Sequence, residues 1–183
     1  VKDNEFRVGL TPGNVSGLVA QGHAVLIQRG AGQQIGLTDE LYRSAGASLV
    51  ESATEVYAKS QLVVKVKEPQ PQECAMLRED QILFTYLHLA PDPIQTKALL
   101  SSGSTCIAYE TVTSRAGTLP LLAPMSEVAG RMSIQAAAAQ MEKSHGGPGI
   151  LLAGIPGVAA AKVVILGAGV VGRNALQMAV GIG

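Results

Sequence analysis

The chain has 183 residues, enough for one domain or for one domain and part of a second. Hydrophobic residues make up 47% of it and charged residues 15%, and its formal net charge is zero. It can therefore bury a sizeable core, but it has no basic surface that would bind nucleic acid or an anionic membrane. Aromatic residues are scarce and tryptophan is absent, which also argues against a surface for stacking bases.

The chain carries no pattern of a secreted or membrane protein. Cys74 and Cys106 lie far apart and have neither metal-ligand nor redox spacing, so we expect two buried free thiols and no metal site. The first residues are polar and charged, unlike a signal peptide. Residues 148–171 contain a single charge, Lys162, but repeated glycine and proline make a loop before a buried strand a better interpretation than a membrane span. We expect a soluble, cytoplasmic protein without membrane contact.

Short helical and strand patterns alternate from residue 11 to residue 109. Helices are predicted after Thr11, Thr38 and Ser52, whose side chains can cap a helix N-terminus. The expected elements are a helix from Pro12 closed by Gly22, strand 24–28, a helix from Thr38 through Tyr42, strand 49–50, helix 53–59, strand 62–67, helix 70–78, strand 81–86, helix 92–101 and strand 104–109. This alternation predicts an α/β fold with a doubly wound parallel sheet.

A longer helical pattern then runs from Ser126 to about Lys143 and ends at a glycine-rich turn. It is followed by a β-branched run at 161–166, which we interpret as a strand. These patterns predict a first domain over residues 1–124 that lacks its first strand, a connecting helix over 125–149, and only the first βα unit of a Rossmann domain over 150–183. Residues 150–183 are too few to cover a parallel strand on both faces, so we expect the chain to be a piece of a longer protein.

The sequence from Gly167 to Gly172 reads G-x-G-x-x-G between the expected strand and a helix. This order is the context that a dinucleotide-binding fingerprint requires. Gly167 allows the tight turn, Gly169 lets the backbone approach a pyrophosphate, and Gly172 allows close packing of helix and strand. The N–H groups of the helix start would face the phosphates. The pattern predicts a dinucleotide site.

Three polar residues of the first domain are candidates for chemistry. Lys67 ends one expected strand, His88 follows the next, and Arg7 lies in the opening segment. Arg7 and Lys67 could hold a carboxylate, and His88 could act as a general acid or base. Each also has a structural interpretation: a surface pair of Lys67 with Glu68, a solvated pair of Arg7 with Glu5, and a core histidine.

Glu110 also ends a strand and could cap the following turn. His23 and His145 lie in glycine-flanked turns and are expected to be exposed.

Seven motifs, in the same order along the whole chain, resemble the alanine dehydrogenase family, whose N-terminal region is shared with pyridine nucleotide transhydrogenase. They are residues 4–8 (NEFRV), 65–69 (KVKEP), 84–90 (FTYLHLA), 108–111 (AYET), 119–126 (LPLLAPMS), 130–131 (GR) and 154–158 (GIPGV). By this resemblance the chain corresponds to about the N-terminal half of the enzyme. The family's catalytic aspartate and ribose-binding acid would follow Gly183.

The resemblance implies NAD-dependent, reversible oxidative deamination of L-alanine to pyruvate and ammonium. Arg7 would bind the substrate carboxylate, and Lys67 its carboxylate or carbonyl side. His88 would act as acid and base on the oxygen of the carbinolamine. The cofactor-binding residues it implies are Met125, Ser126, Gly167, Gly169, Val170, Val171 and Gly172. Members of the family are usually homohexamers.

Three alternatives stay open. The transhydrogenase binds NAD without an amino-acid substrate, and it needs neither Lys67 nor His88, so the presence of both speaks against it. Saccharopine-type dehydrogenases keep a lysine and histidine pair, and the match at residues 124–126 is what argues against them. The third alternative is a non-catalytic fragment, since most of the cofactor domain would be absent.

Overall fold

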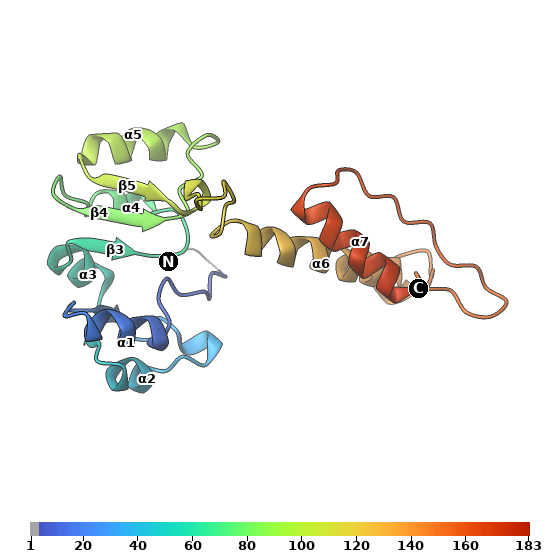
Figure 1. The fold of residues 1–183 in the computed structure, drawn as a ribbon, viewed down its shortest axis with the longest axis horizontal. Helices are drawn as coiled ribbons and strands as arrows, with labels where there is room; N and C mark the ends of the chain where they lie inside the picture. Colours follow the sequence, from blue (N-terminus) through green and yellow to red (C-terminus); the bar gives the residue numbers. More distant parts are fainter. Residues whose placement is uncertain (1–3) are drawn as a thin grey trace. The chain divides into compact units, whose positions relative to one another are not determined.

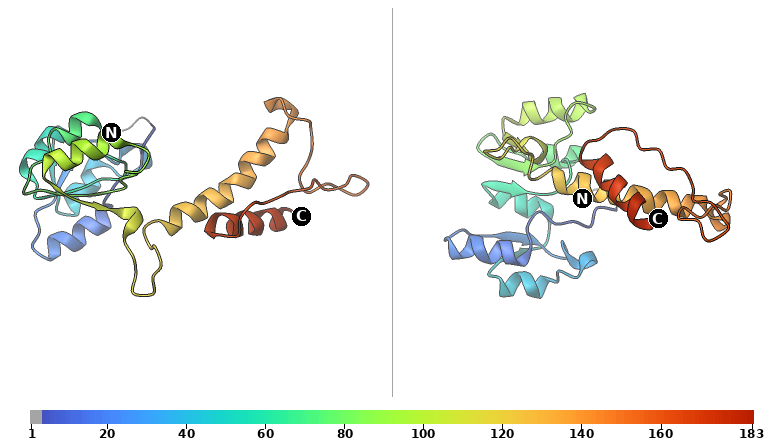
Figure 2. Two further views of the ribbon diagram at one scale, coloured as in Figure 1. Left: turned by 90° about the horizontal axis from the view of Figure 1, so that it is seen from above. Right: turned by 45° about the vertical axis from the view of Figure 1, so that its right-hand side comes forward.

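The computed structural model describes residues 4–183. The chain divides into two compact units, Val1–Glu110 and Thr111–Gly183, and Figures 1 and 2 follow its course. This division falls before the boundary at residue 124 expected from the sequence. Within the described residues, no helix combines the length and apolar character that crossing a bilayer requires.

The first unit alternates strands and helices, as the sequence predicts. Its elements are α1 (Pro12–Ala20), β1 (Leu26–Gln28), η1 (Gln33–Ile35), α2 (Asp39–Ser44), β2 (Ser48–Val50), α3 (Ala53–Lys59), β3 (Leu62–Val64), α4 (Pro71–Cys74), β4 (Ile82–Thr85), α5 (Pro93–Ser102), β5 (Thr105–Ala108) and η2 (Tyr109–Thr111). The three predicted caps are confirmed: Thr11, Thr38 and Ser52 each accept a hydrogen bond from a backbone N–H in the first turn of the helix that follows.

The strands are parallel, which confirms the α/β class, but they form two sheets in place of one continuous doubly wound sheet. One sheet pairs β1 with β2, and the other has the order β3-β4-β5; Figure 1 shows β3, β4 and β5 side by side. The sheets are separate because β1 and β3 are not hydrogen-bonded to each other. A cavity of about 890 Å³ is lined by both strands.

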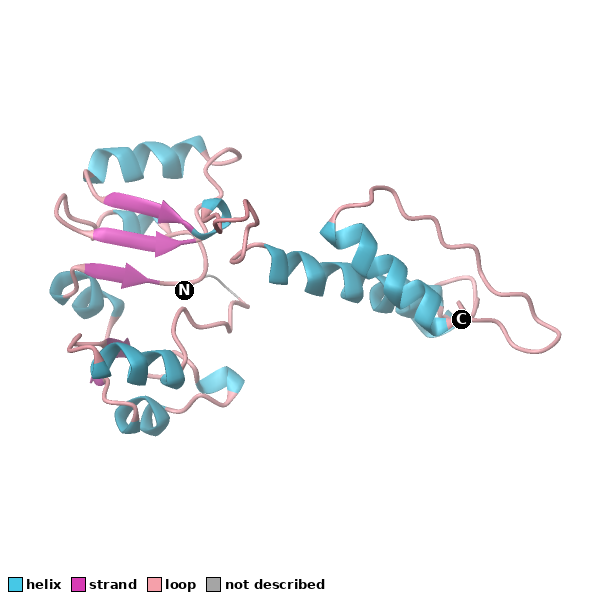
Figure 3. Cartoon of the chain, viewed as in Figure 1, coloured by secondary structure: helices cyan, strands magenta, loops and turns pink. Residues whose placement is uncertain are grey.

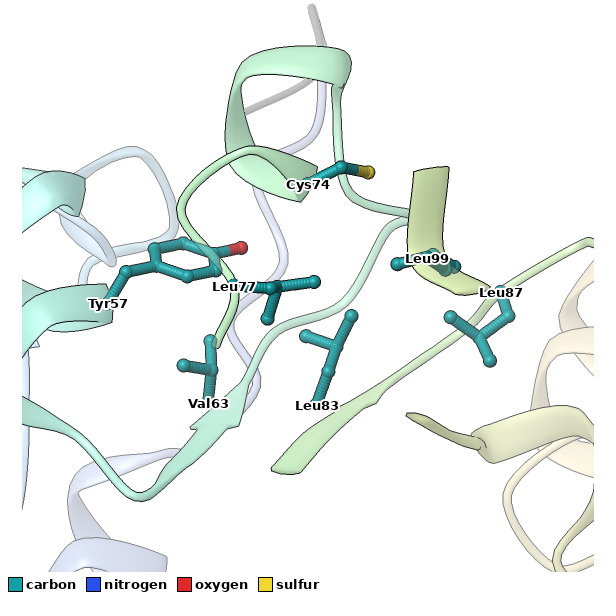
Figure 4. Close-up of a cluster of buried hydrophobic side chains, with 7 residues drawn as sticks. All are labelled: Tyr57, Val63, Cys74, Leu77, Leu83, Leu87 and Leu99. Carbon is teal, nitrogen blue, oxygen red and sulfur yellow. The ribbon is translucent and has the colours of Figure 1, made fainter. Parts of the chain in front are cut away.

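The core of the three-stranded sheet lies on one of its faces. Its buried residues are Tyr57, Val63, Cys74, Leu77, Leu83, Leu87 and Leu99 (Figure 4). Because α3, α4 and α5 all contribute to this cluster, these helices lie on the same face of the sheet. On the other face Leu62, Ile82 and Ile107 remain 37–49% exposed. The sheet β1-β2 has its own core, which contains Val15 of α1 and Tyr42 of α2.

The second unit consists of α6 (Ala123–Met141), η3 (Lys143–His145), a long loop and α7 (Val170–Ile182) (Figure 3). Helix α6 packs closely on α7: a Cβ at Gly130 would overlap the carbonyl oxygen of Val171, and Arg131 Nε donates to Asn174 Oδ1 at 3.1 Å. The long helix predicted from the sequence is therefore present, and one of its sides packs against α7.

The strand predicted at 161–166 is absent; these residues form a loop. A strand needs a hydrogen-bonded neighbour, and within residues 4–183 no segment pairs with this run. Val164 is 73% exposed and Leu166 is 92% exposed, so the apolar sequence is not buried here.

Candidate active site

Polar residues follow the carboxyl ends of the three neighbouring strands β3, β4 and β5. Lys67 lies three residues beyond β3, His88 three residues beyond β4, and Glu110 two residues beyond β5. Because these strands are parallel and adjacent, their carboxyl ends lie at one edge of the sheet. Ligands of α/β sheets bind at this edge. The structure thus brings two of the candidates from the sequence, Lys67 and His88, to the expected place.

The backbone of Lys67 is anchored to the neighbouring strand β4. Its carbonyl oxygen accepts a hydrogen bond from Thr85 Oγ1 at 2.9 Å, and Thr85 is fully buried. The ammonium of Lys67 has no hydrogen bond or ion pair within residues 4–183, so the expected surface pair with Glu68 does not form. Lys67 and Arg7 line the same cavity of about 890 Å³. This cavity can accept an anionic group beside two cations.

The opening segment that carries Arg7 is fixed against the sheet and against α2. A Cβ at Gly9 would lie 3.1 Å from the backbone of Val64, so glycine allows this segment to approach β3. One residue on, the carbonyl oxygen of Leu10 accepts a hydrogen bond from Tyr42 Oη at 2.8 Å. Arg7 is therefore placed at the cavity by backbone contacts.

The guanidinium of Arg7 is paired with Glu5. Arg7 Nε and Nη2 donate to the two oxygens of Glu5 at 2.8 and 2.7 Å. These hydrogen bonds lower the pKa of Glu5, and Lys67 adds to the effect from nearby; Glu5 in turn raises the pKa of Arg7. The pairing of Arg7 with Glu5, which the sequence left open, is therefore present. A ligand carboxylate that binds Arg7 must displace Glu5 or bind beside it.

His88 is an exposed residue, so the interpretation as a core histidine is wrong. Its φ is 49°, in the left-handed region that non-glycine residues rarely adopt. Its ring stacks on that of Tyr86, with centroids 6.0 Å apart and planes at 18°. An exposed imidazole can exchange protons with a bound ligand. Burial raises the pKa of the neighbouring Tyr86, and the positive charge of Arg7 opposes this rise.

Three aromatic rings pack together at this edge of the sheet. Tyr109 makes edge contacts with Phe84 and Tyr86, at centroid distances of 4.3 and 5.0 Å. Burial raises the pKa of Tyr109 to about 12, so its hydroxyl stays neutral. Tyr86 is thereby held between Tyr109 and His88. No sequence periodicity predicts this cluster, because Phe84 lies in β4, Tyr86 follows that strand, and Tyr109 lies in η2 after β5.

Sequence reasoning missed two further polar contacts near the site. The carboxylate of Glu110 accepts hydrogen bonds from the backbone N–H groups of Leu87 and His88. Lys65 Nζ donates to Glu73 Oε2 at 2.5 Å, with side chains 17% and 9% exposed. The position of Glu110 after a strand was the only signal for the first contact. Nothing local in the sequence pairs Lys65 with Glu73.

The glycine fingerprint lies in the second unit, at the start of α7. Gly167 has φ 98°, and a Cβ at Gly172 would overlap the carbonyl oxygen of Gly167, so both positions require glycine. Gly169 is the N-cap of α7 and faces open space. The roles expected for Gly167 and Gly172 in the turn are thus consistent with the structure, although the strand before them is missing.

A cavity of about 540 Å³ lies at the same helix start. Its lining combines residues of α6 with the loop and α7, and it includes Ser126, Gly167, Gly169, Val170, Val171 and Gly172. The structure thus brings Ser126 to the glycine fingerprint. Met125, the preceding residue in α6, is not part of this lining.

The part of the chain that the structure describes contains no cluster of metal-binding side chains. No group of three His, Cys, Asp or Glu side chains gathers within residues 4–183. Both cysteines are free, as expected; Cys74 is buried, whereas Cys106 is only half-buried. His23 and His145 are exposed, which confirms that prediction.

Comparison with known proteins gives a consistent result over the whole chain. The family profile described as alanine dehydrogenase/PNT, N-terminal domain, matches residues 1–129, and the corresponding C-terminal domain profile matches residues 133–183. The alanine dehydrogenase of Bacillus subtilis is 55% identical over all 183 residues, which cover 48% of its length. That of Halomonas elongata is 53% identical, with 49% of its length covered.

Solved structures agree with the sequence relatives. An L-alanine dehydrogenase superposes on the whole chain with a TM-score of 0.92 at 51% identity, and half of that protein is covered. A transhydrogenase from Sinorhizobium meliloti superposes with a TM-score of 0.81 at 25% identity, with 54% of it covered. The chain spans about half the length of the curated relatives it matches.

Proposed function

Because the chain belongs to the alanine dehydrogenase/PNT family, we propose that it takes part in the NAD-dependent, reversible oxidative deamination of L-alanine to pyruvate and ammonium. The observation that carries this proposal is the placement of Lys67 and His88 after two adjacent parallel strands, with Arg7 on the same cavity as Lys67. One edge of the sheet thus offers cations for a carboxylate and an imidazole for proton transfer.

Each of the three side chains has a distinct role in this proposal. Arg7 binds the substrate carboxylate through its planar fork, which already holds the carboxylate of Glu5. Lys67 binds the carboxylate or carbonyl side as a point charge. His88 takes a proton from the substrate oxygen in one direction and returns it in the other, which a reversible reaction requires.

The residues at the start of α7 fit a dinucleotide. The close approach of Gly172 to Gly167 and the open space beside Gly169 leave backbone N–H groups of the first turn accessible to a pyrophosphate. Gly167, Gly169, Val170, Val171 and Gly172 would hold this group, and Met125 and Ser126 would contact the nicotinamide side. When bound, NAD would supply the hydride acceptor for the reaction.

The alternatives are less well supported. The transhydrogenase relative is 25% identical, against 51% for the L-alanine dehydrogenase structure.

We further propose that the 183-residue chain has no turnover by itself, because Val164 and Leu166 are exposed apolar residues that a complete Rossmann sheet would bury. By analogy with the family, the whole enzyme would be a cytoplasmic homohexamer. Sedimentation would test the hexameric state.

The test is kinetic and uses the longer enzyme that contains this chain. We expect alanine-dependent NADH formation, followed by absorbance, to fall by at least about 100-fold in His88→Gln, the loss typical of a missing acid–base group. In the reverse assay, which follows NADH consumption with pyruvate and ammonium, Lys67→Met should chiefly raise KM for pyruvate. The matched control is His145→Gln, an exposed histidine of the second unit. Normal turnover in His88→Gln, or equal losses in His88→Gln and His145→Gln, would contradict the proposed role of His88.

A further inference from the structure

The peptide that joins Leu87 to His88 is held from both sides. Its N–H, which belongs to His88, donates to Glu110 Oε1 at 2.8 Å. Its carbonyl, which belongs to Leu87, accepts a hydrogen bond from Gln95 Nε2 at 2.6 Å. The N–H of Leu87 itself also donates to the carboxylate of Glu110, at 3.0 and 3.2 Å from its two oxygens. Both polar groups of this peptide are therefore fixed by side chains.

The backbone at His88 needs such support. A φ of 49° is unfavourable for a residue with a side chain, and such conformations persist where surrounding contacts impose them. Leu87, one residue earlier, is buried in the core with 3% exposed, so the chain turns from the core to the surface within two residues. An anionic acceptor for two successive N–H groups stabilises this turn more than a neutral acceptor would.

We propose that Glu110 is a positioning residue for His88. Glu110 lies in η2, two residues beyond the neighbouring strand β5, and its carboxylate fixes the peptide plane from which the His88 side chain extends. The direction of the imidazole toward a substrate oxygen thus depends on an acid that need not touch the substrate. The kinetic part of this inference rests on the proposed role of His88, whereas the backbone contact can be tested without it.

The variants Glu110→Gln and Glu110→Ala separate the effects of charge and of contact. Glu110 Oε1 accepts from both N–H groups, so the single carbonyl oxygen of glutamine can keep both hydrogen bonds without the negative charge. Alanine removes both. The control is Glu79→Gln, which neutralises an exposed carboxylate of the same unit.

Two measurements are made on these variants. In the 18.8 kDa chain, ¹⁵N–¹H correlation spectra should show the amide proton of His88 moving upfield in Glu110→Gln and further in Glu110→Ala. In the longer enzyme, kcat should fall in the same order, by about 10-fold and about 100-fold, as expected for a misplaced catalytic group. KM for pyruvate should stay within about 2-fold, because Arg7 and Lys67 lie on other segments. Glu79→Gln should change neither quantity.

The outcomes are distinguishable. A kcat at the wild-type level in Glu110→Gln and Glu110→Ala, with the His88 amide shifted, would overturn the positioning role. An unshifted His88 amide would overturn the contact itself. If Glu110→Ala does not fold, the kcat and amide shift of Glu110→Gln decide. If instead His88→Gln retains turnover while the amide shift behaves as expected, the proposed function of His88 fails and the backbone contact stands.

Discussion

The buried ion pair between Lys65 and Glu73 gives a sharp prediction about stability. Replacing Lys65 by methionine keeps the apolar length of the side chain and removes the charge. The carboxylate of Glu73, which is 9% exposed, then loses its ammonium partner and, among residues 4–183, keeps only the backbone N–H of Gln70, at 2.7 Å. We expect the free energy of unfolding to fall, because an uncompensated charge stays buried.

The size of the effect follows from the geometry. At 2.5 Å and an effective dielectric constant of about 20, the attraction between the charges is roughly 7 kcal/mol, most of which offsets the cost of taking both charges out of water. Removing one partner of such a pair costs about 3–5 kcal/mol. Lys65 is 17% exposed and the Gln70 contact remains, so we expect about 3 kcal/mol. The double variant Lys65→Met/Glu73→Gln should cost only about 1 kcal/mol, because no unpaired charge is buried and glutamine can still accept from the N–H of Gln70.

Tyrosine fluorescence during urea unfolding measures this effect in the right part of the chain. All four tyrosines lie between residues 42 and 109, within the first unit, and the chain has no tryptophan. The matched control is Lys59→Met, which breaks the exposed pair with Glu55, where the side chains are 57% and 37% exposed. That change should cost no more than about 0.5 kcal/mol. Equal costs for Lys65→Met and Lys59→Met, at unchanged m values, would show that burial does not set the cost of breaking the pair.

Three further predictions concern other contacts. Tyr57→Phe should raise the free energy of unfolding by about 1 kcal/mol, because its hydroxyl is buried without a hydrogen-bond partner among residues 4–183 and burial raises its pKa; a loss of stability in urea unfolding would mean that the hydroxyl makes a stabilising contact. Since Arg7 lowers the pKa of Glu5, their pairing contributes fully to stability above the ordinary carboxyl pKa and contributes less as the pH falls through the lowered pKa. Glu5→Gln should therefore reduce the loss of stability at acid pH. An unchanged loss would contradict a contribution from this pair. Gly172→Ala should weaken NAD binding in the longer enzyme by at least about 10-fold by calorimetry, because its Cβ would overlap the turn, whereas Gly181→Ala, with open space around it in the same helix, should bind normally and stabilise α7 by up to about 1 kcal/mol.

The helices of the first unit could be predicted because their signals are local. Thr11, Thr38 and Ser52 each precede a helix, and a capping hydroxyl needs only the N–H groups that follow it. The strands were less predictable. The strand predicted over 62–67 ends at Val64, and the run at 161–166 forms no strand at all. Strand formation depends on a partner elsewhere, and sequence patterns do not contain that partner.

The candidate site shows the same limit. Lys67 and His88 could be placed at the edge of the sheet because each follows an expected strand. The contact of Glu110 with the His88 peptide joins residues 22 positions apart, so only the three-dimensional structure identifies it. The exposure of His88 is likewise set by a left-handed backbone after a buried leucine, which its apolar neighbours in the sequence concealed.

The separation of the two sheets has a consequence for how the chain behaves in solution. Within the described residues, β1 is hydrogen-bonded only to β2 and β3 only to β4, and the strands β1 and β3 line one cavity. An edge strand offers its backbone to any extended segment, and two such edges across one opening can hold a segment on both sides. An extended segment of a second molecule would pair with the backbone of one of these edges. Concentrated solutions of this chain should therefore associate through them, and a short extended peptide should suppress the association.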